Sequence, residues 1–534
     1  IKSLNFNYYY LMKYSALFFG LLIATNCVFA QTEDLGIKYA NTITASELEN
    51  HLTIFASDYY EGRETGTRGL SRAADYLSKQ FTLSGVPPLQ ANGGYFRDYP
   101  LVQYQWANST IASDKNLFNM MTDFYGYAGA NNSFSYTAND IVFLGYGIDD
   151  TLYSDYKNVD VKGKIVLIAS GEPMVNGKSV ITGSDSLIAW SKDWRKKAAA
   201  ATSNGVMCLL TIDPKLAEIL NNPQWKNFLE GSLIKRQSEY KQPEYTNNLF
   251  ISQNMADKLL GKKKKFIQKT IDKISTTGKP ANFLVKNTIV FNVVKTENTI
   301  YADNVLAFVE GTDLKEEVIV VSAHYDHLGK KDTIIYNGAD DDGSGTIALL
   351  EISEAVAKAK SNGEGPRRSV LFIAFSGEEK GLLGSKAYAD NPAIPFENTV
   401  ANLNIDMIGR VDEEHTATPN YVYIIGSNFL STALHSINEA AAKNYTNIEL
   451  DYKYNSTTDP NRYYYRSDHY NFAKNNIPVI FYFNGTHEDY HQPTDDVEKI
   501  NFPVYEARCR LVFHTLWILA NQDARIKVDV AQED

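Results

Sequence analysis

The stretch Val318–Gly345, which reads VIVVSAHYDHLGKKDTIIYNGADDDGSG, decides the fold. Its apolar, β-branched run ends abruptly at His324, and a loop with several glycines then brings Asp340, Asp341 and Asp342 to the start of an expected helix. A continuous apolar run of this length is typical of a strand that is covered on both faces. Polar residues at the carboxyl end of such a strand lie where open α/β sheets form their binding crevice. The stretch therefore predicts an α/β domain with a metal site at the edge of its sheet.

Strands and helices alternate from Tyr301 to the end of the chain. Apolar runs predict strands at 317–323, 369–375, 400–406, 420–425 and 478–483. Helical spacing predicts helices at 344–360, 380–389, 428–443, 468–475 and 503–521. The first of these helices carries Leu349, Ile352 and Val356 on one face, as a helix that packs on a sheet requires. Because the run VLFIAF at 370–375 is apolar throughout, we expect helices on both faces of the sheet and hence a three-layer α/β domain.

Residues 44–86 show two helical patterns separated by a glycine-rich loop, and residues 90–135 indicate loops with some strand.

A second, smaller α/β domain is expected after them. It begins with short strands at 140–147 and 163–170, the end of a helix at 198–204 and a strand at 206–212, and a polar, helical pattern follows at 214–278. This strand–strand–helix–strand module lies between two stretches that look like parts of one other domain, so we interpret it as an insertion.

Composition limits the class of protein. The 534 residues are 44% hydrophobic and 22% charged, as in an ordinary globular protein, and are enough for more than one domain. The net charge of −11 argues against a nucleic-acid partner, because nucleic-acid binders usually present a basic face. Cleavage after Ala30 would leave only Cys208 and Cys509, which form no disulfide framework. Any metal ion must therefore be held by histidines and carboxylates.

Residues 1–30 resemble a signal peptide, with Met12 as the natural start. An apolar run at 14–25 follows Lys13, and Val28-Phe29-Ala30 has the small-x-small form of a cleavage site. The run is too short for a confident membrane span, so no integral membrane segment is expected after cleavage. These features predict a secreted or periplasmic protein. Lipoprotein anchoring through Cys27 is the alternative, although Asn26 is a poor fit to the small residue expected before such a cysteine.

Histidines and carboxylates stand at the carboxyl ends of the predicted strands. Four such places are His324, the loop Asp340–Asp342, the pair Glu378-Glu379 and Asp406, and His491 lies in the loop after a further strand. Because the carboxyl ends of strands converge on one crevice, these residues can meet despite their separation in sequence. Imidazole with carboxylate is the ligand set of catalytic zinc, and two zinc ions can be held if one carboxylate bridges them. One glutamate of the adjacent pair can then ligate while the other accepts a proton from water.

Each place also has an ordinary structural explanation. A carboxylate at a strand end is often a helix cap or a salt-bridge partner, and the Glu378-Glu379 pair can cap the helix expected after it. The three aspartates followed by Gly343 can form a turn. Five places within one domain, all at predicted strand ends, favour a shared site over five separate structural roles.

Five motifs resemble those of the co-catalytic di-zinc aminopeptidase family that includes secreted bacterial leucyl aminopeptidases. They are SAHYDHLG (322–329), NGADDDGSG (337–345), FSGEEKGLLGS (375–385), NIDMIGR (404–410) and DYHQPTDD (489–496). The segment EGRETGTRG (61–69) is similar to the opening of the family's domain. The resemblance implies a three-layer α/β/α zinc-peptidase domain with a mixed central sheet, a metallo-aminopeptidase activity on peptide substrates and two zinc ions per chain.

The resemblance also implies roles for single residues. His324 and Asp406 match ligands of one zinc ion, Glu379 and His491 match ligands of the other, and Asp341 matches the carboxylate that bridges them.

Three further positions match catalytic groups of the family. Glu378 matches the general base, and Asp326 matches the carboxylate that orients His324, a role that metal-bound imidazoles usually require. Tyr490 is similar to a tyrosine that steadies the tetrahedral intermediate in some members. Asp340 and Asp342 are expected to be loop structure.

The inserted module resembles a protease-associated domain through GKIVLIASGEP (163–173) and KAAAATSNGVMCLL (197–210). The expected division is a signal peptide at 1–30, a peptidase domain split between 31–133 and 291–534, and the inserted domain with a helical extension at 134–290. Glutaminyl cyclases share the fold but use one zinc ion, and the full ligand set disfavours them. A di-zinc carboxypeptidase and a catalytically silent peptide-binding surface protein stay open as alternatives. The sequence does not predict the oligomeric state.

Overall fold

The computed structural model describes residues 34–531, apart from 90–93, 114, 223–224, 227–228, 230–232 and 240–243. The expected signal peptide, with Met12, Cys27 and Ala30, lies outside the described residues. Within the described ranges, no helix combines the length and the apolar character that crossing a membrane requires.

The chain folds into two compact units. The first unit contains residues up to Asp98 and residues Asp303–Asp534, and the second is Tyr99–Ala302. The divisions thus fall at 98/99 and 302/303, whereas the sequence predicted 133/134 and 290/291. Strands β2 (Thr110–Ser113) and β3 (Asn116–Asn119) account for the earlier division, because they join the sheet of the second unit.

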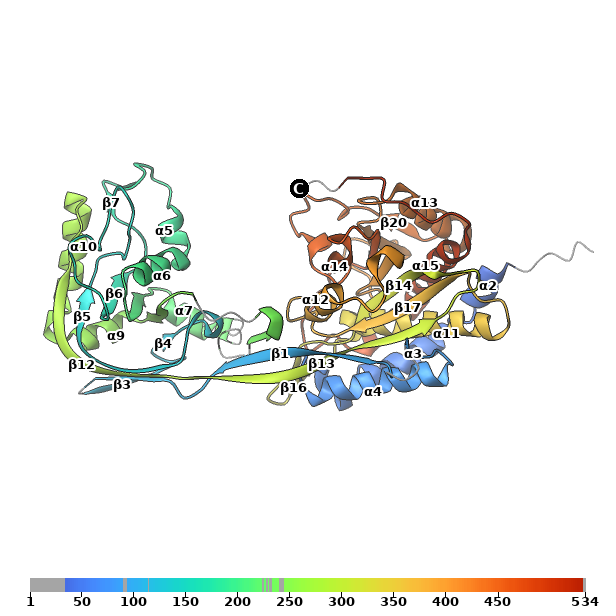
Figure 1. Ribbon diagram of the computed structural model, residues 1–534, viewed down its shortest axis with the longest axis horizontal. Helices are drawn as coiled ribbons and strands as arrows, with labels where there is room; N and C mark the ends of the chain where they lie inside the picture. Colours follow the sequence, from blue (N-terminus) through green and yellow to red (C-terminus); the bar gives the residue numbers. More distant parts are fainter. Residues whose placement is uncertain are drawn as a thin grey trace, which may run out of the picture. The chain divides into compact units, whose positions relative to one another are not determined.

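The first unit is built on a mixed sheet (Figure 1). Its strands are β13 (Lys295–Val309), β14 (Leu314–His324), β17 (Arg368–Phe375), β18 (Thr399–Ile405), β19 (Tyr421–Ile425), β20 (Glu449–Asp451) and β21 (Val479–Phe483). With β1 (Phe96–Trp106) and β10 (Leu233–Arg236), the full order is β10-β1-β13-β17-β14-β18-β21-β19-β20. Four central strands, β17, β14, β18 and β21, run parallel to one another, and β13 and β19 are antiparallel to their neighbours β17 and β21. The mixed sheet predicted for the peptidase domain is present.

Helices cover both faces of this sheet. They are α2 (Leu35–Ala40), α3 (Ala45–Phe55), α4 (Arg68–Leu83), α11 (Gly345–Ser361), α12 (Leu383–Asp390), α13 (Thr432–Ala441), α14 (Tyr470–Ala473) and α15 (Phe502–Asn521). Helices α11 and α15 contact β14 and β17, and α2, α3 and α4 pack on α11. On the other face, Tyr388 of α12 and Phe472 of α14 share a core with Val320, Leu371 and Ile373. Figure 1 shows β14 and β17 between these two helical layers.

Alternation along the strands explains the three layers. All eight residues of β17 are buried, so successive side chains enter the cores on opposite faces. Helix α12 begins at Leu383 rather than at 380, because residues 380–382 belong to the turn after Glu379 in which Gly381 and Leu382 have positive φ. The small antiparallel pair β15 (Gly329–Lys331) and β16 (Ile334–Tyr336) forms part of the connection after β14.

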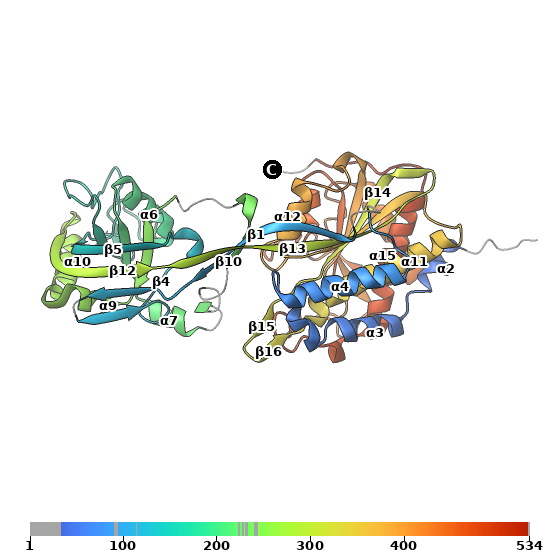
Figure 2. The same cartoon turned by 60° about the horizontal axis from the view of Figure 1, so that its bottom comes forward.

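The second unit has an eight-stranded sheet in the order β3-β2-β12-β5-β6-β9-β11-β4 (Figure 2). Its further strands are β4 (Phe124–Tyr125), β5 (Phe134–Phe143), β6 (Ile165–Ala169), β9 (Cys208–Ile212), β11 (Asn247–Ile251) and β12 (Phe283–Val293). The remaining elements of this unit are β7 (Met174–Val175), β8 (Lys178–Ser179), α5 (Ala189–Lys192), α6 (Trp194–Ser203), α7 (Leu216–Asn221), α9 (Gln253–Leu260) and α10 (Lys265–Thr277).

Alternate strand residues of the second unit enter two separate cores. Ile165 and Leu167 of β6 pack in the core that contains α9, whereas Val166 and Ile168 pack with Ala201 of α6. Strand β11 lies within 214–278, for which the sequence predicted a helical pattern. The reason is tertiary, because β11 pairs in parallel with β9, and the backbone N–H of its buried Asn248 also donates to Asn131 Oδ1 at 2.7 Å.

Candidate metal centre

The sheet brings the predicted site residues to one edge. His324 ends β14, Glu378 and Glu379 lie three and four residues beyond the end of β17, and Asp406 directly follows β18. His491 lies in the loop after β21. Since these four strands are parallel, their carboxyl ends lie at the same edge, and residues from four distant segments converge there.

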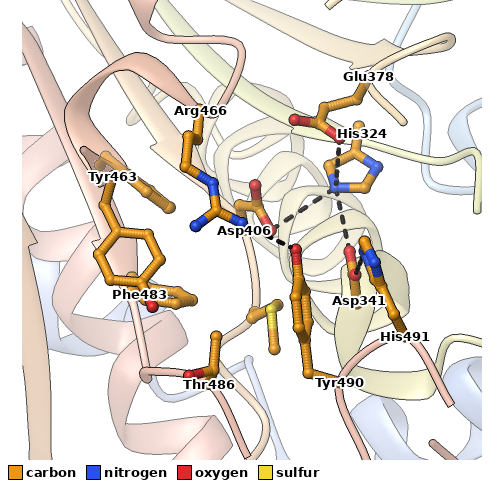
Figure 3. A pocket seen from close by; sticks show the side chains of 12 residues that line it. His324, Asp341, Glu378, Asp406, Tyr463, Arg466, Phe483, Thr486, Tyr490 and His491 are labelled. Carbon is orange, nitrogen blue, oxygen red and sulfur yellow. Dashed lines mark hydrogen bonds and ion pairs between the residues drawn. The ribbon is translucent and has the colours of Figure 1, made fainter. Parts of the chain in front are cut away.

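Asp341 lies at the centre of the cluster, as Figure 3 shows. Its Oδ1 is 3.4 Å from Nε2 of His324, and its Oδ2 is 3.1 Å from Nε2 of His491. The Nε2 atom of His324 is also 3.6 Å from Oδ1 of Asp406, and Nε2 of His491 is 3.3 Å from Oε2 of Glu379. The one carboxylate thus faces two groups of ligating atoms, one on each oxygen. The structure brings together all five residues that the resemblance implies as metal ligands.

These separations fit atoms that share a metal ion. Tetrahedral zinc with bonds of about 2.0–2.2 Å holds its ligand atoms roughly 3.3 Å apart. Two groups of such atoms within 4.8 Å of one another occur among the described residues, namely His324 with Asp342 and Asp406, and His327 with Asp341 and Glu379.

Several polar atoms of the second group lack hydrogen-bond partners among the described residues. They are Oδ2 of Asp341, Oε1 of Glu379 and both ring nitrogens of His327. Buried polar groups without partners are rare and costly, so these atoms are suited to a ligand. A divalent cation can bind the two carboxylate oxygens and one ring nitrogen of His327, and the donor set of imidazoles and carboxylates suits zinc.

Opposite charges control the protonation of the cluster. Burial lowers the pKa of His324, but Asp406 and other carboxylates raise it more, so that it lies well above its usual range. Burial raises the pKa of Asp341, whereas His324 and His491 lower it more, to well below its usual range. The pKa of His491 is raised to about 10 by Asp341 and its other carboxylate neighbour, although burial opposes this. The imidazoles therefore supply positive charge that a cation can supply instead.

Asp342 has a structural role despite its proximity to the first group. Its Oδ1 accepts hydrogen bonds from the backbone N–H groups of Gly345 and Met407, at 2.8 and 3.0 Å. Its Oδ2 accepts from the backbone N–H of His324 at 3.2 Å. Both oxygens are thus engaged in fixing the strand ends. The carboxylates near Nε2 of His324 that remain for an ion are those of Asp341 and Asp406. The prediction that Asp342 is loop structure agrees with these contacts.

Asp340 also fixes the loop. Its Oδ1 accepts from the backbone N–H of Gly409 at 2.7 Å and from Ser344 Oγ at 2.9 Å, and its Oδ2 lies 3.1 Å from Nε2 of His487.

Glu378 lies beside the first group, and Asp326 positions it. The Oε2 atom of Glu378 is 3.9 Å from Nε2 of His324. Burial raises the pKa of Glu378 well above its usual range, with help from neighbouring carboxylates and against the effect of His324. Asp326 accepts hydrogen bonds from the backbone N–H of Glu378 at 3.1 Å and from Thr65 Oγ1 at 2.7 Å. Its backbone oxygen is 3.1 Å from Nδ1 of His324. Asp326 therefore contacts both residues.

An opening beside the cluster is lined by both polar and apolar residues (Figure 3). They are His324, Asp341, Glu378, Asp406, Met407, Tyr463, Arg466, Phe481, Phe483, Thr486, Tyr490 and His491. The hydroxyl of Tyr490 accepts a hydrogen bond from Arg466 at 3.2 Å, and its ring stacks on His491 with the centroids 3.9 Å apart. Tyr490 thus lines the same opening as the ligating residues.

Comparison with known proteins finds relatives of the residues that form the cluster. The model of Peptidase family M28 matches residues 304–516, which contain every residue of the cluster. Residues 304–516 are therefore similar to this family, and they are named the M28 segment after it. The resemblance to the di-zinc aminopeptidase family is confirmed at this level.

Relatives of the M28 segment carry aminopeptidase names. Aminopeptidase Y of Saccharomyces cerevisiae is 28% identical over 232 residues, 41% of this chain and 38% of the relative. Leucine aminopeptidase 1 of Fusarium vanettenii is 26% identical over 245 residues, 42% of this chain and 60% of the relative. The chain thus spans from about two fifths to three fifths of the length of these relatives.

Two solved structures share the fold. The aminopeptidase of Aneurinibacillus sp. strain AM-1 has a TM-score of 0.54 at 17% identity, and the match covers 93% of this chain and 100% of that one. The zinc aminopeptidase of Bacillus subtilis has a TM-score of 0.50 at 17% identity, covering 92% of this chain and 99% of that one. These likenesses confirm the α/β fold predicted for the peptidase domain.

Sequence reasoning missed one histidine of the M28 segment. His327 is fully buried, and its Nδ1 is 2.9 Å from Oε1 of Glu379 and 3.8 Å from Oδ2 of Asp341. It follows His324 by three residues in SAHYDHLG, beyond the end of β14, where alternation along a strand no longer tells which way a side chain points. The available signal was the second histidine in the motif SAHYDHLG, close in sequence to the first.

Proposed function

We propose that this protein is a zinc-dependent aminopeptidase that removes N-terminal residues from peptides with two metal ions and a glutamate base. The convergence of four ligand candidates around a fifth, the central carboxylate of Asp341, with Glu378 beside them, carries this proposal. The M28 match and the names of the relatives support it. Glutaminyl cyclase chemistry with one zinc ion is disfavoured, because each oxygen of Asp341 faces a histidine of its own, His324 on one side and His491 on the other.

The ligands divide into two sets in this proposal. His324 and Asp406 hold one zinc ion, Glu379 and His491 hold the other, and Asp341 bridges both. The distances on the two sides of Asp341, from 3.1 to 3.6 Å, support this division.

Glu378 acts as the general base. When bound, a pair of zinc ions polarises the scissile carbonyl and lowers the pKa of water. Glu378 accepts the proton from the attacking water and delivers it to the leaving amine. Its fixed position, held through the bond from its backbone N–H to Asp326, supports this role. The hydroxyl of Tyr490, which accepts from Arg466 and keeps its own proton to donate, steadies the developing oxyanion.

The decisive experiment compares two neighbouring glutamates. We expect Glu378→Gln to retain two zinc ions by mass-spectrometric metal analysis and to lose about 10²–10⁴-fold in kcat on aminoacyl chromogenic amides. Glu379→Gln should instead lose zinc. Chelation should abolish wild-type turnover, and added zinc should restore it. Full activity of Glu378→Gln would refute its role, and activity that is indifferent to chelator would remove the metal from the reaction.

Peptides with differently labelled ends decide between the aminopeptidase and a di-zinc carboxypeptidase, because each trims the opposite terminus. A mass-spectrometric digest of a peptide library then gives the side-chain preference. A protein that binds no zinc would instead favour the silent peptide-binding alternative.

The second unit, Tyr99–Ala302, is proposed to be the inserted protease-associated-like domain. Its parallel strands β6, β9 and β11, packed between helices on two faces, support this interpretation. Export to the periplasm or the exterior, with anchoring through Cys27 as the alternative, stays a prediction from residues 1–30.

A further inference from the structure

His327 is buried in the metal centre without a hydrogen-bond partner for its ring among the described residues. Its exposed fraction is 0%, and neither Nδ1 nor Nε2 makes a hydrogen bond. The residue is held in place from both sides. Its backbone N–H donates to the backbone oxygen of Arg63 at 3.3 Å, and a Cβ atom on Gly338 would lie 2.5 Å from its Cδ2. The absence of a side chain at Gly338 therefore makes room for this imidazole.

The surroundings of Nδ1 are those of a ligating atom. Nδ1 is 2.9 Å from Oε1 of Glu379, in a geometry that forms no hydrogen bond, and 3.8 Å from Oδ2 of Asp341, which is too far for one. On the far side of Glu379 and Asp341 lies His491, whose Nε2 is 3.3 and 3.1 Å from their Oε2 and Oδ2 atoms. Two imidazoles thus approach the same two carboxylates, with their ring centroids 6.0 Å apart. The four separations between donor atoms, from 2.9 to 3.8 Å, lie on both sides of the roughly 3.3 Å expected around one tetrahedral zinc ion.

We infer that His327 is a fourth protein ligand of the second metal position. The inference rests on the two-metal site of the proposed function, which assigned Asp341, Glu379 and His491 to this position. With His327 the position has two nitrogen and two oxygen ligands.

The two metal positions are therefore unequal. A zinc site with four protein ligands is closed, whereas one with three keeps an open position for water or substrate. The first position has only His324, Asp341 and Asp406, because Asp342 is occupied by backbone N–H groups. The open position thus lies on the side where Glu378 stands, 3.9 Å from His324 Nε2. The second position holds its ion tightly and fixes the bridging carboxylate, and the first position is where water is activated.

The direct test counts imidazoles around zinc in the wild-type protein by X-ray absorption spectroscopy. We expect three imidazoles shared between two zinc ions. Two imidazoles in a protein that holds two zinc ions would overturn the inference but leave the proposed function intact. A protein that binds no zinc would instead overturn the two-metal site itself, so the two failures are distinguishable. This measurement needs no variant and cannot be confused with misfolding.

Zinc titration of variants provides the second test. We expect His327→Gln to bind the first zinc ion as the wild type does and to bind the second at least 100-fold more weakly. The control is His514→Gln, since His514 is a buried histidine of α15 that stacks on Tyr445 away from the cluster. Equal affinity for both ions in His327→Gln and the wild type would overturn the inference.

Discussion

Arg63 is a buried cation that joins the loops of the metal centre, and its removal offers a quantitative test of this structure. Its side chain is 0% exposed and donates four hydrogen bonds to backbone oxygens. The acceptors are Phe55 at 3.3 Å, Tyr325 at 2.9 Å, Asn337 at 2.6 Å and Gly338 at 2.8 Å. Tyr325 follows His324, and the last two acceptors precede the aspartate loop, so one side chain holds both ligand-bearing segments.

The expected loss follows from these four bonds. Arg63→Met fills a similar volume but donates none of them, and it leaves four backbone oxygens short of a partner. At about 1–1.5 kcal/mol net for each bond, the free energy of unfolding should fall by roughly 4–6 kcal/mol. Burial opposes the charged side chain, since it lowers the pKa of Arg63 to about 10, which favours the lower end of that range. Arg63→Lys keeps a charge and fewer donors, so its loss should be about half as large.

Unfolding of the first unit can be followed selectively. Of the five tryptophans, only Trp517 lies outside Tyr99–Ala302, so replacing the other four by phenylalanine leaves a single reporter in the unit that contains Arg63. Urea midpoints of the zinc-free proteins, multiplied by the slope of the transition, then give the change in the free energy of unfolding.

A matched arginine on the surface provides the control. Arg72 donates one hydrogen bond to the backbone oxygen of Tyr59 at 2.8 Å from a partly exposed position, and Arg72→Met should cost less than about 1 kcal/mol. Arg63→Met should also bind zinc more weakly, because Asp341 then loses its fixed place. A loss below 1 kcal/mol in Arg63→Met, equal to that in Arg72→Met, would refute the reasoning.

Two further outcomes are expected from the buried carboxylates. Burial, with neighbouring Glu47 and Glu354, raises the pKa of Glu351 from 4.5 to about 8, so the folded protein keeps this group protonated while the unfolded chain ionises. The stability that this proton provides is complete below about pH 4.5 and is lost as the pH rises to about 8. The melting temperature of Glu351→Gln should therefore rise relative to that of the wild type over that interval. Parallel pH profiles of the two melting temperatures would contradict this. Asp326→Asn turns an amide N–H₂ toward one of two donors, Thr65 or the backbone N–H of Glu378, and should lower kcat or zinc affinity about 10–100-fold. Unchanged kinetics and zinc titration in that variant would show that Asp326 does not position the site.

Much of the peptidase fold followed from local pattern. Apolar runs of strand length identified β14, β17, β18, β19 and β21 to within a few residues, because a strand covered on both faces must be apolar throughout. The site followed with it, since parallel strands bring His324, Asp341 and Asp406 to one edge whatever the sequence distance between them. Strand β11 was not predicted, because it forms through parallel pairing with β9, a contact between segments that are distant in the sequence.

The sequence by itself determined which residue types stand at the strand ends, and with them the imidazole and carboxylate chemistry of the centre. Only the tertiary structure decided which of those residues face the metal positions and which fix the loops. Asp341 and Asp342 are adjacent and chemically identical, yet one faces ligating atoms and the other accepts backbone N–H groups. His327 is turned into the site because Gly338 leaves space beside it. The direction of a side chain in a loop is set by its packing neighbours, which come from elsewhere in the chain, and not by its own place in the sequence.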